Sequence, residues 1–330
     1  MHEINDLRPE VLPRALSGTD ESAVRVSVIV PMYNASAYIE TSLASVAGQS
    51  FRDIELIAID DGSSDDTIEK ATRFLAGSGL RHSILRMPSN GGPARARNLG
   101  VATARGKYIA FIDADDEWLP GKLASQVALM DSDPTITLCG CQALWVDSEN
   151  NTTSLLFNGL PSRLPFGWKN LLWSCYVATP CALVRREDLG ISPFVPSLRV
   201  GEDRHLWISL ATNGSVALVQ EVMVKIRVST VSYMATHSSC IVNNTLPMIR
   251  GFVRIFSDSL SITERMKAIG SVYSNIGKAF CQTPAFYAAG AQYLLRAALL
   301  GHNPVDNLRF AILSAPGISK IKAMLKKAYH

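Results

Sequence analysis

The stretch VSVIVPMY at residues 26–33 opens the part of the chain that decides its fold. Its first five residues are almost all β-branched, which is typical of a parallel strand buried on both faces. Pro31 has no backbone N–H and is predicted to end this strand. A second apolar run at 54–59 leads directly into two aspartates and a glycine. We therefore expect two buried strands with polar residues following their carboxyl ends.

Strands and helices alternate at a regular pitch around this stretch. Apolar runs predict further strands at 84–85 and 108–112, and the segments before them, from about 65 and at 94–104, predict helices. A crossover helix returns the chain to the same edge of the sheet, so the alternation predicts an α/β fold with a mostly parallel, doubly wound sheet. Ligands of such sheets bind beyond the carboxyl ends of the strands.

The chain is predicted to divide into three parts. Residues 1–23 combine mixed charges and prolines, which predicts a flexible leader. Residues 24–235 are expected to form the α/β domain, with a first half at about 24–118 and a second half at about 119–235. Beyond this point the patterns are helical alone, so residues 236–330 are expected to form a helical C-terminal appendage.

The bulk composition limits the classes of function. Hydrophobic residues make up 47% of the chain and charged residues 18%, which indicates a folded core and argues against disorder. The net charge of +3 is too small to predict a nucleic-acid partner. The six cysteines form no CxxC pair, and neither a spanning helix nor a secretory signal is predicted. We expect a cytoplasmic protein, with the inner face of the membrane as the alternative location.

Three carboxylates follow the strand predicted at 108–112, namely Asp113, Asp115 and Asp116. Carboxylates this close repel one another, and a bound divalent cation is the usual compensation. Magnesium and manganese take oxygen ligands and leave room for substrate phosphates. The alternative is a solvated acidic turn that caps the next helix.

Two further acidic motifs are candidates. Asp60 and Asp61 precede Gly62 at the end of the second strand, where a carboxylate can accept hydrogen bonds from a base N–H or from ribose hydroxyls. A turn followed by a helix cap explains this motif equally well. Glu202 and Asp203 start a predicted helix, where acidic residues commonly complement the helix dipole. Transfer of a group to a hydroxyl needs a general base, which makes the pair a candidate for that role.

The loop at 90–98 carries Arg95 and Arg97, which could pair with a diphosphate. The alternative is that they form structural ion pairs with Asp60, Asp61 or the aspartates predicted to bind metal. No GxGxxG follows the first strand, and neither GxxxxGK[ST] nor GxSxG is found. These absences disfavour a dinucleotide dehydrogenase, a P-loop nucleotide hydrolase and a serine hydrolase.

Several motifs, in this order, resemble those of glycosyltransferase family 2. They are VSVIVPMYN at 26–34, DDGSSD at 60–65, RNLG at 97–100, DADD at 113–116 and EDRHLW at 202–207. The resemblance covers about residues 25–230. It implies a GT-A fold, a nucleoside-diphosphate sugar donor, with a UDP-sugar as first choice, and inverting transfer of a hexosyl or N-acetylhexosaminyl group to a hydroxyl. It further implies a saccharide or lipid-linked acceptor, in the synthesis of cell-surface polysaccharide or glycolipid.

The resemblance also implies roles for residues of the donor half. Pro31, Tyr33 and Asp61 would line the nucleoside pocket, and Asp113 would lie near the ribose. Arg95 and Arg97, named above, would be near the diphosphate.

For the metal and the acceptor side, the resemblance implies that Asp115 and Asp116 hold Mn²⁺ or Mg²⁺ at the diphosphate. Asp203 would be the general base, with Glu202 as the alternative. The stretch at 191–200 lacks the glycine-and-phenylalanine pattern expected just before this acidic pair.

Two other functions are compatible with clustered aspartates. A nucleotidyltransferase should carry a glycine-rich basic loop after the first strand, where this chain has PMYN at 31–34. A catalytically silent sugar-nucleotide-binding partner of a polysaccharide assembly is disfavoured by the complete set of aspartates.

The C-terminal sequence suggests one further partner. Ile318, Ile321 and Leu325 share a helical face, and four lysines at 320–327 lie near it. A basic amphipathic helix can lie on an anionic membrane, so peripheral membrane contact is predicted here. The alternative is an ordinary terminal helix docked on its neighbours, with its lysines in solvent.

Overall fold

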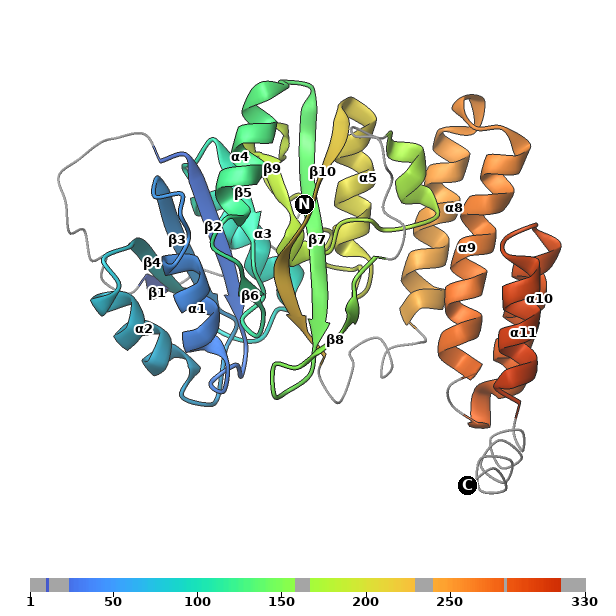
Figure 1. The fold of residues 1–330 in the computed structure, drawn as a ribbon, viewed down its shortest axis with the longest axis horizontal. Helices are drawn as coiled ribbons and strands as arrows, with labels where there is room; N and C mark the ends of the chain where they lie inside the picture. Colours follow the sequence, from blue (N-terminus) through green and yellow to red (C-terminus); the bar gives the residue numbers. More distant parts are fainter. Residues whose placement is uncertain (1–9, 12–23, 158–166, 229–239, 282–283, 316–330) are drawn as a thin grey trace. The chain divides into compact units, whose positions relative to one another are not determined.

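The computed structural model describes residues 10–11, 24–157, 167–228, 240–281 and 284–315, which are drawn in colour in Figure 1. Contacts within the chain divide it into two compact units. The first contains the sheet and its helices, and the second contains the helices beyond residue 240. The domain boundaries predicted at residues 23 and 235 fall in segments outside the described residues, and they stay predictions.

Four neighbouring parallel strands form the N-terminal half of the sheet (Figure 1). In their order across the sheet they are β4 (Arg81–Arg86), β3 (Ile54–Asp60), β2 (Val26–Met32) and β5 (Tyr108–Phe111). The helices that connect them are α1 (Ile39–Ala47), α2 (Thr67–Gly77) and α3 (Pro93–Thr103). The short strand β1 (Glu10–Val11) pairs antiparallel with β4. The predicted α/β fold with a doubly wound parallel sheet is therefore confirmed.

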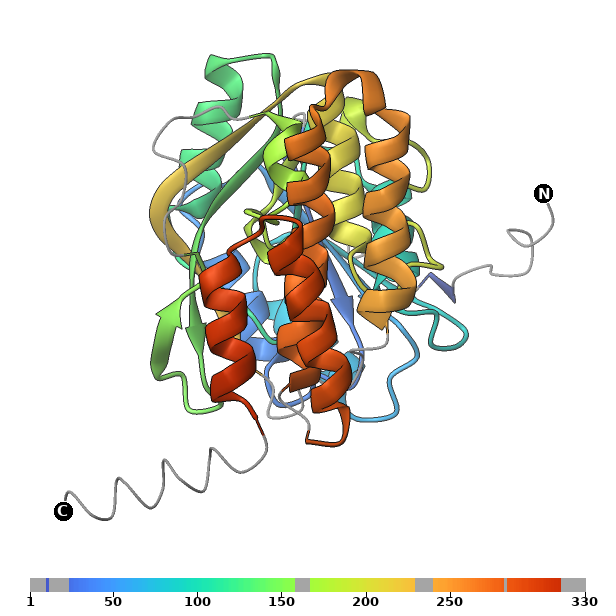
Figure 2. The same cartoon turned by 90° about the vertical axis from the view of Figure 1, so that its right-hand side faces the viewer.

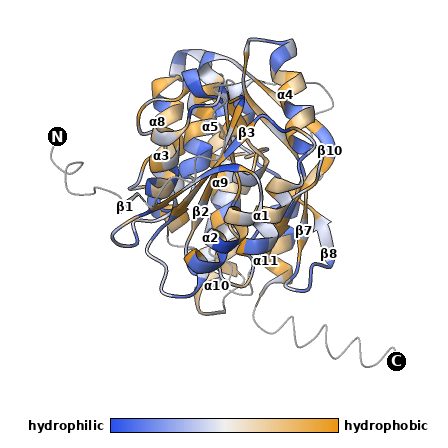
Figure 3. Cartoon of the chain, turned by 90° about the vertical axis from the view of Figure 1, so that its left-hand side faces the viewer, coloured by the Kyte–Doolittle hydropathy of each residue, from blue (hydrophilic) through white to orange (hydrophobic). Residues whose placement is uncertain are grey.

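The core of this unit lies between the strands and the helices that cover them. Val28 of β2 and Leu56 of β3 have no exposed surface. Helix α2 buries Ile68, Ala71 and Leu75, and its ribbon carries both hydrophobic and hydrophilic colours in Figure 3. The β-branched composition noted in the sequence thus corresponds to strands buried on both faces.

Strand β2 continues through Pro31, so the predicted end of this strand is wrong. Pro31 pairs with Ile59 of β3, and the strand runs on to Met32. Pairing with β5 stops at Ile29, whose carbonyl oxygen accepts the N–H of Ile112. Alternate residues of a strand direct their backbone groups to the same side, so Pro31 faces the side from which β5 has departed. The proline therefore costs β2 no ladder hydrogen bond.

Beyond β5 the sheet becomes mixed. The remaining strands are β6 (Glu117–Trp118), β7 (Ile136–Val146), β8 (Thr152–Leu155), β9 (Leu183–Arg185) and β10 (Ser215–Arg227). Strand β9 pairs antiparallel with β5 and β7, whereas β10 runs parallel to β7. Across the described residues the order is β1-β4-β3-β2-β5-β9-β7-β10-β6, and β8 pairs with β7. The strands β1, β6 and β8 were not predicted, because runs of two to four residues are too short to show a period, and β1 lies within the segment 1–23 that was predicted to be a flexible leader.

Helix α5 (Glu202–Asn213) is anchored beside β5 by aromatic side chains. Phe111 at the end of β5 meets Phe194 edge to face, with 5.2 Å between the ring centroids. Trp207 of α5 lies 6.2 Å from Phe111 and 6.3 Å from Phe194. The three rings are fully buried, so they fix the start of α5 near the carboxyl end of β5.

The remaining helical elements lie in the sheet unit and in the chain that follows it. They are α4 (Lys122–Ser132), the 3₁₀ helices Trp168–Leu172, Thr179–Cys181, Arg186–Asp188, Ser257–Ser259 and Pro284–Phe286, and the π-helical turn Ile241–Thr245. Among the described residues, no helix combines the length and apolar character that crossing a membrane requires.

The second unit is helical, which confirms the predicted helical C-terminal region. Its helices are α8 (Leu246–Ile255), α9 (Ile262–Cys281), α10 (Tyr287–Leu299) and α11 (Pro304–Leu313), seen in orange to red in Figure 2. Helices α9 and α10 approach closely at two glycines. A Cβ atom at Gly277 would lie 2.6 Å from Cγ of Leu294, and one at Gly290 would lie 2.7 Å from Sγ of Cys281. A side chain at either position would push the two helices apart.

Candidate active site

Three of the polar residues predicted to bind the donor lie where neighbouring strands end. Tyr33 follows β2, Asp61 follows β3, and Asp113 lies two residues beyond β5. These strands are adjacent and parallel, so their carboxyl ends share one edge of the sheet. Tyr33 is half exposed there, whereas Asp61 is buried. The structure thus brings the three residues to one edge, with an accessible aromatic ring among them.

Asp61 holds the loop that leads into α3. One carboxylate oxygen accepts the N–H of Gly91 at 2.7 Å, and the other accepts the N–H of Gly92 at 2.8 Å. The pKa of Asp61 is raised above its ordinary value by burial. The two hydrogen bonds and the charge of the exposed Arg95 oppose this rise. Gly62 has a φ of 76°, and a Cβ atom there would lie 3.0 Å from the backbone nitrogen of Asn90. Each oxygen of Asp61 keeps a second lone pair for a ligand.

Arg97 of α3 connects the end of β5 to the start of α5. Its guanidinium lies 2.7 Å from Oδ1 of Asp113 and 3.0 Å from Oε1 of Glu202, and it packs over the ring of Phe194. Burial alone would lower the pKa of Arg97, but the two carboxylates raise it above its ordinary value. Burial and the charge of Asp203 raise the pKa of Glu202 to about 7, against the effect of Arg97. This arrangement favours the structural ion-pair alternative for Arg97.

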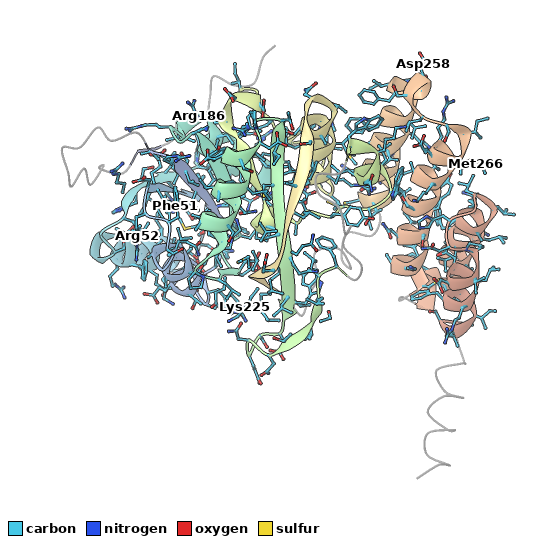
Figure 4. The ribbon with its side chains drawn as sticks, turned by 45° about the horizontal axis from the view of Figure 1, so that its top comes forward. Phe51, Arg52, Arg186, Lys225, Asp258 and Met266 are labelled. Carbon is cyan, nitrogen blue, oxygen red and sulfur yellow. The ribbon has the colours of Figure 1, made fainter. Side chains whose placement is uncertain are left out.

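Asp115 and Asp116 lie in the loop between β5 and β6. Burial and the charge of Asp113 raise the pKa of Asp115 to about 6, and the same causes, with Asp115 added, raise the pKa of Asp116. Oδ1 of Asp116 accepts the backbone N–H of Arg227 at 2.9 Å. Lys225, labelled in Figure 4, pairs with Glu117 at 3.2 Å and joins β10 to β6 beside this loop.

The chemistry of this loop fits a hard divalent cation. Asp113, Asp115 and Asp116 supply oxygen donors, and the repulsion between these close carboxylates, of which Asp116 is buried, is the situation that a cation relieves. Within the described part of the chain, no three or more His, Cys, Asp or Glu side chains are grouped as a metal site. A cation here would therefore need further ligands, such as phosphates and water, which Mg²⁺ usually keeps.

Asp203 differs from its neighbour Glu202 in its partners. One of its oxygens accepts the hydroxyl of Thr179 at 3.2 Å, and the other accepts the backbone N–H of Arg204 at 2.6 Å. Glu202 instead faces the guanidinium of Arg97. Both acidic residues thus lie at the first turn of α5, but of these two only Glu202 forms an ion pair with Arg97.

Two residues of the site were missed by the sequence analysis. Arg227, at the end of β10, donates from Nε to the carbonyl oxygen of Asp115 at 3.2 Å and from Nη1 to that of Asp147 at 2.8 Å. Its guanidinium stacks on the ring of Tyr38 at 4.5 Å. A basic residue at the carboxyl end of an apolar strand was the available signal for Arg227. Nothing in the sequence pointed to Thr179.

Comparison with solved structures defines the fold class. The S. aureus TarS fragment 1–349 matches with a TM-score of 0.57 and 17% identity, over 88% of this chain and 90% of that one. The mannosyltransferase PcManGT from Pyrobaculum calidifontis, in complex with GDP-Man and Mn²⁺, matches with a TM-score of 0.55 and 20% identity, over 92% and 89%. The TarS fragment in complex with UDP-GlcNAc has a TM-score of 0.54. The described fold is thus that of the GT-A glycosyltransferases.

Sequence comparison defines the family. The pattern of glycosyl transferase family 2 matches residues 27–190. The Escherichia coli UDP-Glc:alpha-D-GlcNAc-diphosphoundecaprenol beta-1,3-glucosyltransferase WfgD is 30% identical, over 59% of this chain and 72% of its own length. The putative teichuronic acid biosynthesis glycosyltransferase TuaG of Bacillus subtilis is 31% identical, over 58% and 74%. The chain therefore belongs to glycosyltransferase family 2, as the resemblance predicted.

Some relatives are much longer than this chain. An uncharacterized glycosyltransferase of Rickettsia felis is 31% identical over 62% of this chain, which corresponds to 33% of the relative. The chain thus matches about a third of the length of the relatives from Rickettsia felis and Rickettsia conorii.

Proposed function

We propose that this protein is an inverting glycosyltransferase that moves a hexosyl or N-acetylhexosaminyl group from a nucleoside-diphosphate sugar to a hydroxyl. The observation that carries the proposal is the pair of bonds made by Arg97, 2.7 Å to Asp113 and 3.0 Å to Glu202. Through them, the acidic pair on α5 is held next to the strand end that carries the clustered aspartates. A base beside the donor site is what transfer to a hydroxyl requires.

The nucleoside is expected to bind at the ends of β2 and β3. The exposed ring of Tyr33 offers a stacking surface, and the second lone pairs of Asp61 can accept a base N–H. Pro31 would contact the nucleoside beside these two residues, and Asp113 would accept a hydrogen bond from a ribose hydroxyl. A UDP-sugar is the first choice, since WfgD is named for UDP-Glc and TarS has a complex with UDP-GlcNAc.

The diphosphate is expected to lie over the aspartate loop. Asp115 and Asp116 would hold Mn²⁺ or Mg²⁺, and such a cation would supply positive charge for the leaving diphosphate. Arg227 is fixed beside this loop by carbonyl oxygens and by Tyr38, and the exposed Arg95 lies on the first turn of α3. Both arginines can add positive charge, whereas Arg97 acts as a positioning residue.

Asp203 is the proposed general base. It accepts the proton of the acceptor hydroxyl while the acceptor oxygen bonds to the anomeric carbon and the bond from that carbon to the diphosphate breaks. Attack on the face opposite the leaving group inverts the configuration. The hydroxyl of Thr179 orients Asp203, and the arginine that partly neutralises Glu202 leaves Asp203 as the stronger candidate.

The acceptor is expected to be a saccharide or a lipid-linked saccharide in cell-surface polysaccharide or glycolipid synthesis. WfgD is named for a diphosphoundecaprenol-linked acceptor and TuaG for teichuronic acid biosynthesis. We expect the protein to act in the cytoplasm, at the inner face of the membrane when the acceptor is lipid-linked. The basic segment proposed to contact the membrane, around Ile321, lies outside the described residues.

A panel of nucleotide sugars tests the proposal. We expect one or a few UDP-sugars to bind and to be hydrolysed slowly in the presence of Mn²⁺, with faster turnover when the acceptor is added. Binding without hydrolysis or transfer to any acceptor would instead indicate a silent sugar-nucleotide-binding protein. Release of pyrophosphate from a nucleoside triphosphate and a sugar phosphate would indicate a nucleotidyltransferase.

A further inference from the structure

Helix α11 turns apolar side chains outward. Val305, Leu308 and Ile312 are 74%, 44% and 62% exposed, and they recur at the spacing of one helix face. On the neighbouring helix α10, Leu295 and Leu299 are 50% and 74% exposed. We call these five side chains the apolar stripe.

The one buried residue of α11 is polar. Asn307 is fully buried, its side-chain oxygen accepts the hydroxyl of Ser274 on α9 at 2.6 Å, and its amide donates to the carbonyl oxygen of His302 at 2.6 Å. The hydroxyl of Tyr287 on α10 donates to the carbonyl oxygen of Ala311 at 2.8 Å. These bonds fix the rotation of α11 beside α10, and Figure 2 shows the two helices next to each other. The outward stripe is therefore set by the packing of the unit.

Helix α11 departs from the usual pattern of a surface helix at Val305, Leu308 and Ile312. A helix on the surface of a globular protein normally places its apolar residues on the core and its polar residues in water. Contiguous exposed apolar side chains mark surfaces that bind another protein or a membrane. The apolar stripe is therefore a candidate binding surface.

The charges around the stripe indicate which occupant fits. Arg296 of α10 and Arg309 of α11 are exposed beside it. The one exposed carboxylate of α11 is Asp306, three residues before Arg309. An anionic surface complements the two exposed arginines beside the stripe, Arg296 and Arg309.

We propose that α10 and α11 form a docking surface for an anionic phospholipid membrane. The apolar stripe enters the boundary between headgroups and acyl chains, and Arg296 and Arg309 pair with lipid phosphates. This proposal goes beyond the proposed function, since it rests on the helical unit alone. The residues of the docking surface precede the basic C-terminal segment in the chain.

Sedimentation of the full chain with vesicles tests this proposal. We expect binding to vesicles that contain phosphatidylglycerol, weak binding to pure phosphatidylcholine, and loss of binding as the salt concentration rises. The double variant Leu308→Gln/Ile312→Gln should bind phosphatidylglycerol vesicles at least about tenfold more weakly. Its helical circular dichroism and unfolding midpoint should match those of the wild type, because both side chains are exposed.

The matched control is Ile191→Gln, which removes an exposed apolar side chain from the sheet unit and should leave vesicle binding unchanged. Equal vesicle binding by the double variant and the wild type, or equally strong binding to phosphatidylcholine, would overturn the proposal. A dimer in light scattering that the double variant loses, with no vesicle binding by either protein, would instead assign the stripe to a second copy. Nucleotide-sugar binding should be the same in all variants, so failure here is distinct from failure of the proposed function.

Discussion

The carboxyl edge of the sheet buries charged groups, whereas helices α10 and α11 expose apolar ones. At the sheet edge, Arg97 and Asp116 are almost completely buried, and Arg97 is shared between two carboxylates. On the helices, Leu299 and Val305 are largely exposed, while Asn307 is buried. Both arrangements cost stability relative to ordinary burial. The difference is the basis of two separate proposals, a charged ligand at the sheet edge and an anionic membrane surface at the helices.

The largest expected effect is the loss of transfer at the aspartate loop. Asp115→Asn removes one carboxylate charge proposed to hold the metal, so turnover should fall about 10³-fold or more, and excess chelator should have a similar effect on the wild type. Initial rates of transfer, with circular dichroism as the control for folding, measure this. Full activity in excess chelator would show that transfer does not need a metal.

The second effect separates the two arginines of α3. Arg97→Gln leaves Asp113 and Glu202 without their buried partner, so the free energy of unfolding should fall by about 3–5 kcal/mol. The matched control Arg95→Gln changes an exposed residue on the same helix and should cost less than about 0.5 kcal/mol. Urea denaturation of both variants gives the comparison. Similar losses in the two would show that burial of Arg97 does not matter.

A smaller effect is the pH dependence contributed by Glu202. Its pKa in the folded protein is about 7, above the ordinary value of 4.5, so the folded state holds an extra proton between these pH values. The stability that this proton gives is present below about pH 4.5 and is lost as the pH rises through 7. Relative to wild type, Glu202→Gln should therefore gain stability between pH 5 and 8, by about 1 kcal/mol or less per pH unit. A difference that stays flat over this range would contradict the shifted pKa.

Most of the fold could be predicted from local pattern, because buried parallel strands are long, β-branched and followed by amphipathic helices. The strands that could not be predicted, β1, β6 and β8, are short, and β1 and β6 also depend on partners distant in sequence. Pro31 misled the prediction for a related reason. Whether a proline can sit in a strand depends on which neighbour is present at that position, and the sequence does not contain this information.

The candidate site could be predicted as a set of acidic motifs but not as a network. The sequence left open whether Arg97 faces a ligand or a carboxylate, and the structure bonds it to Asp113 and Glu202, from segments that are 16 and 105 residues away. Arg227 is separated from its partner Asp115 by 112 residues. Such contacts depend on the packing of α5 and β10, which a periodic pattern does not fix.

The most direct test of the central claim is the comparison of Asp203→Asn with wild type in steady-state transfer and in equilibrium binding of the UDP-sugar. If Asp203 is the base beside a donor site, kcat should fall by about 10²–10⁴-fold while the Kd for the donor stays unchanged. Glu202→Gln, its neighbour on α5, should lose less activity. Full transfer by Asp203→Asn, with Glu202→Gln inactive, would move the base to Glu202, and full transfer by both variants would contradict the account.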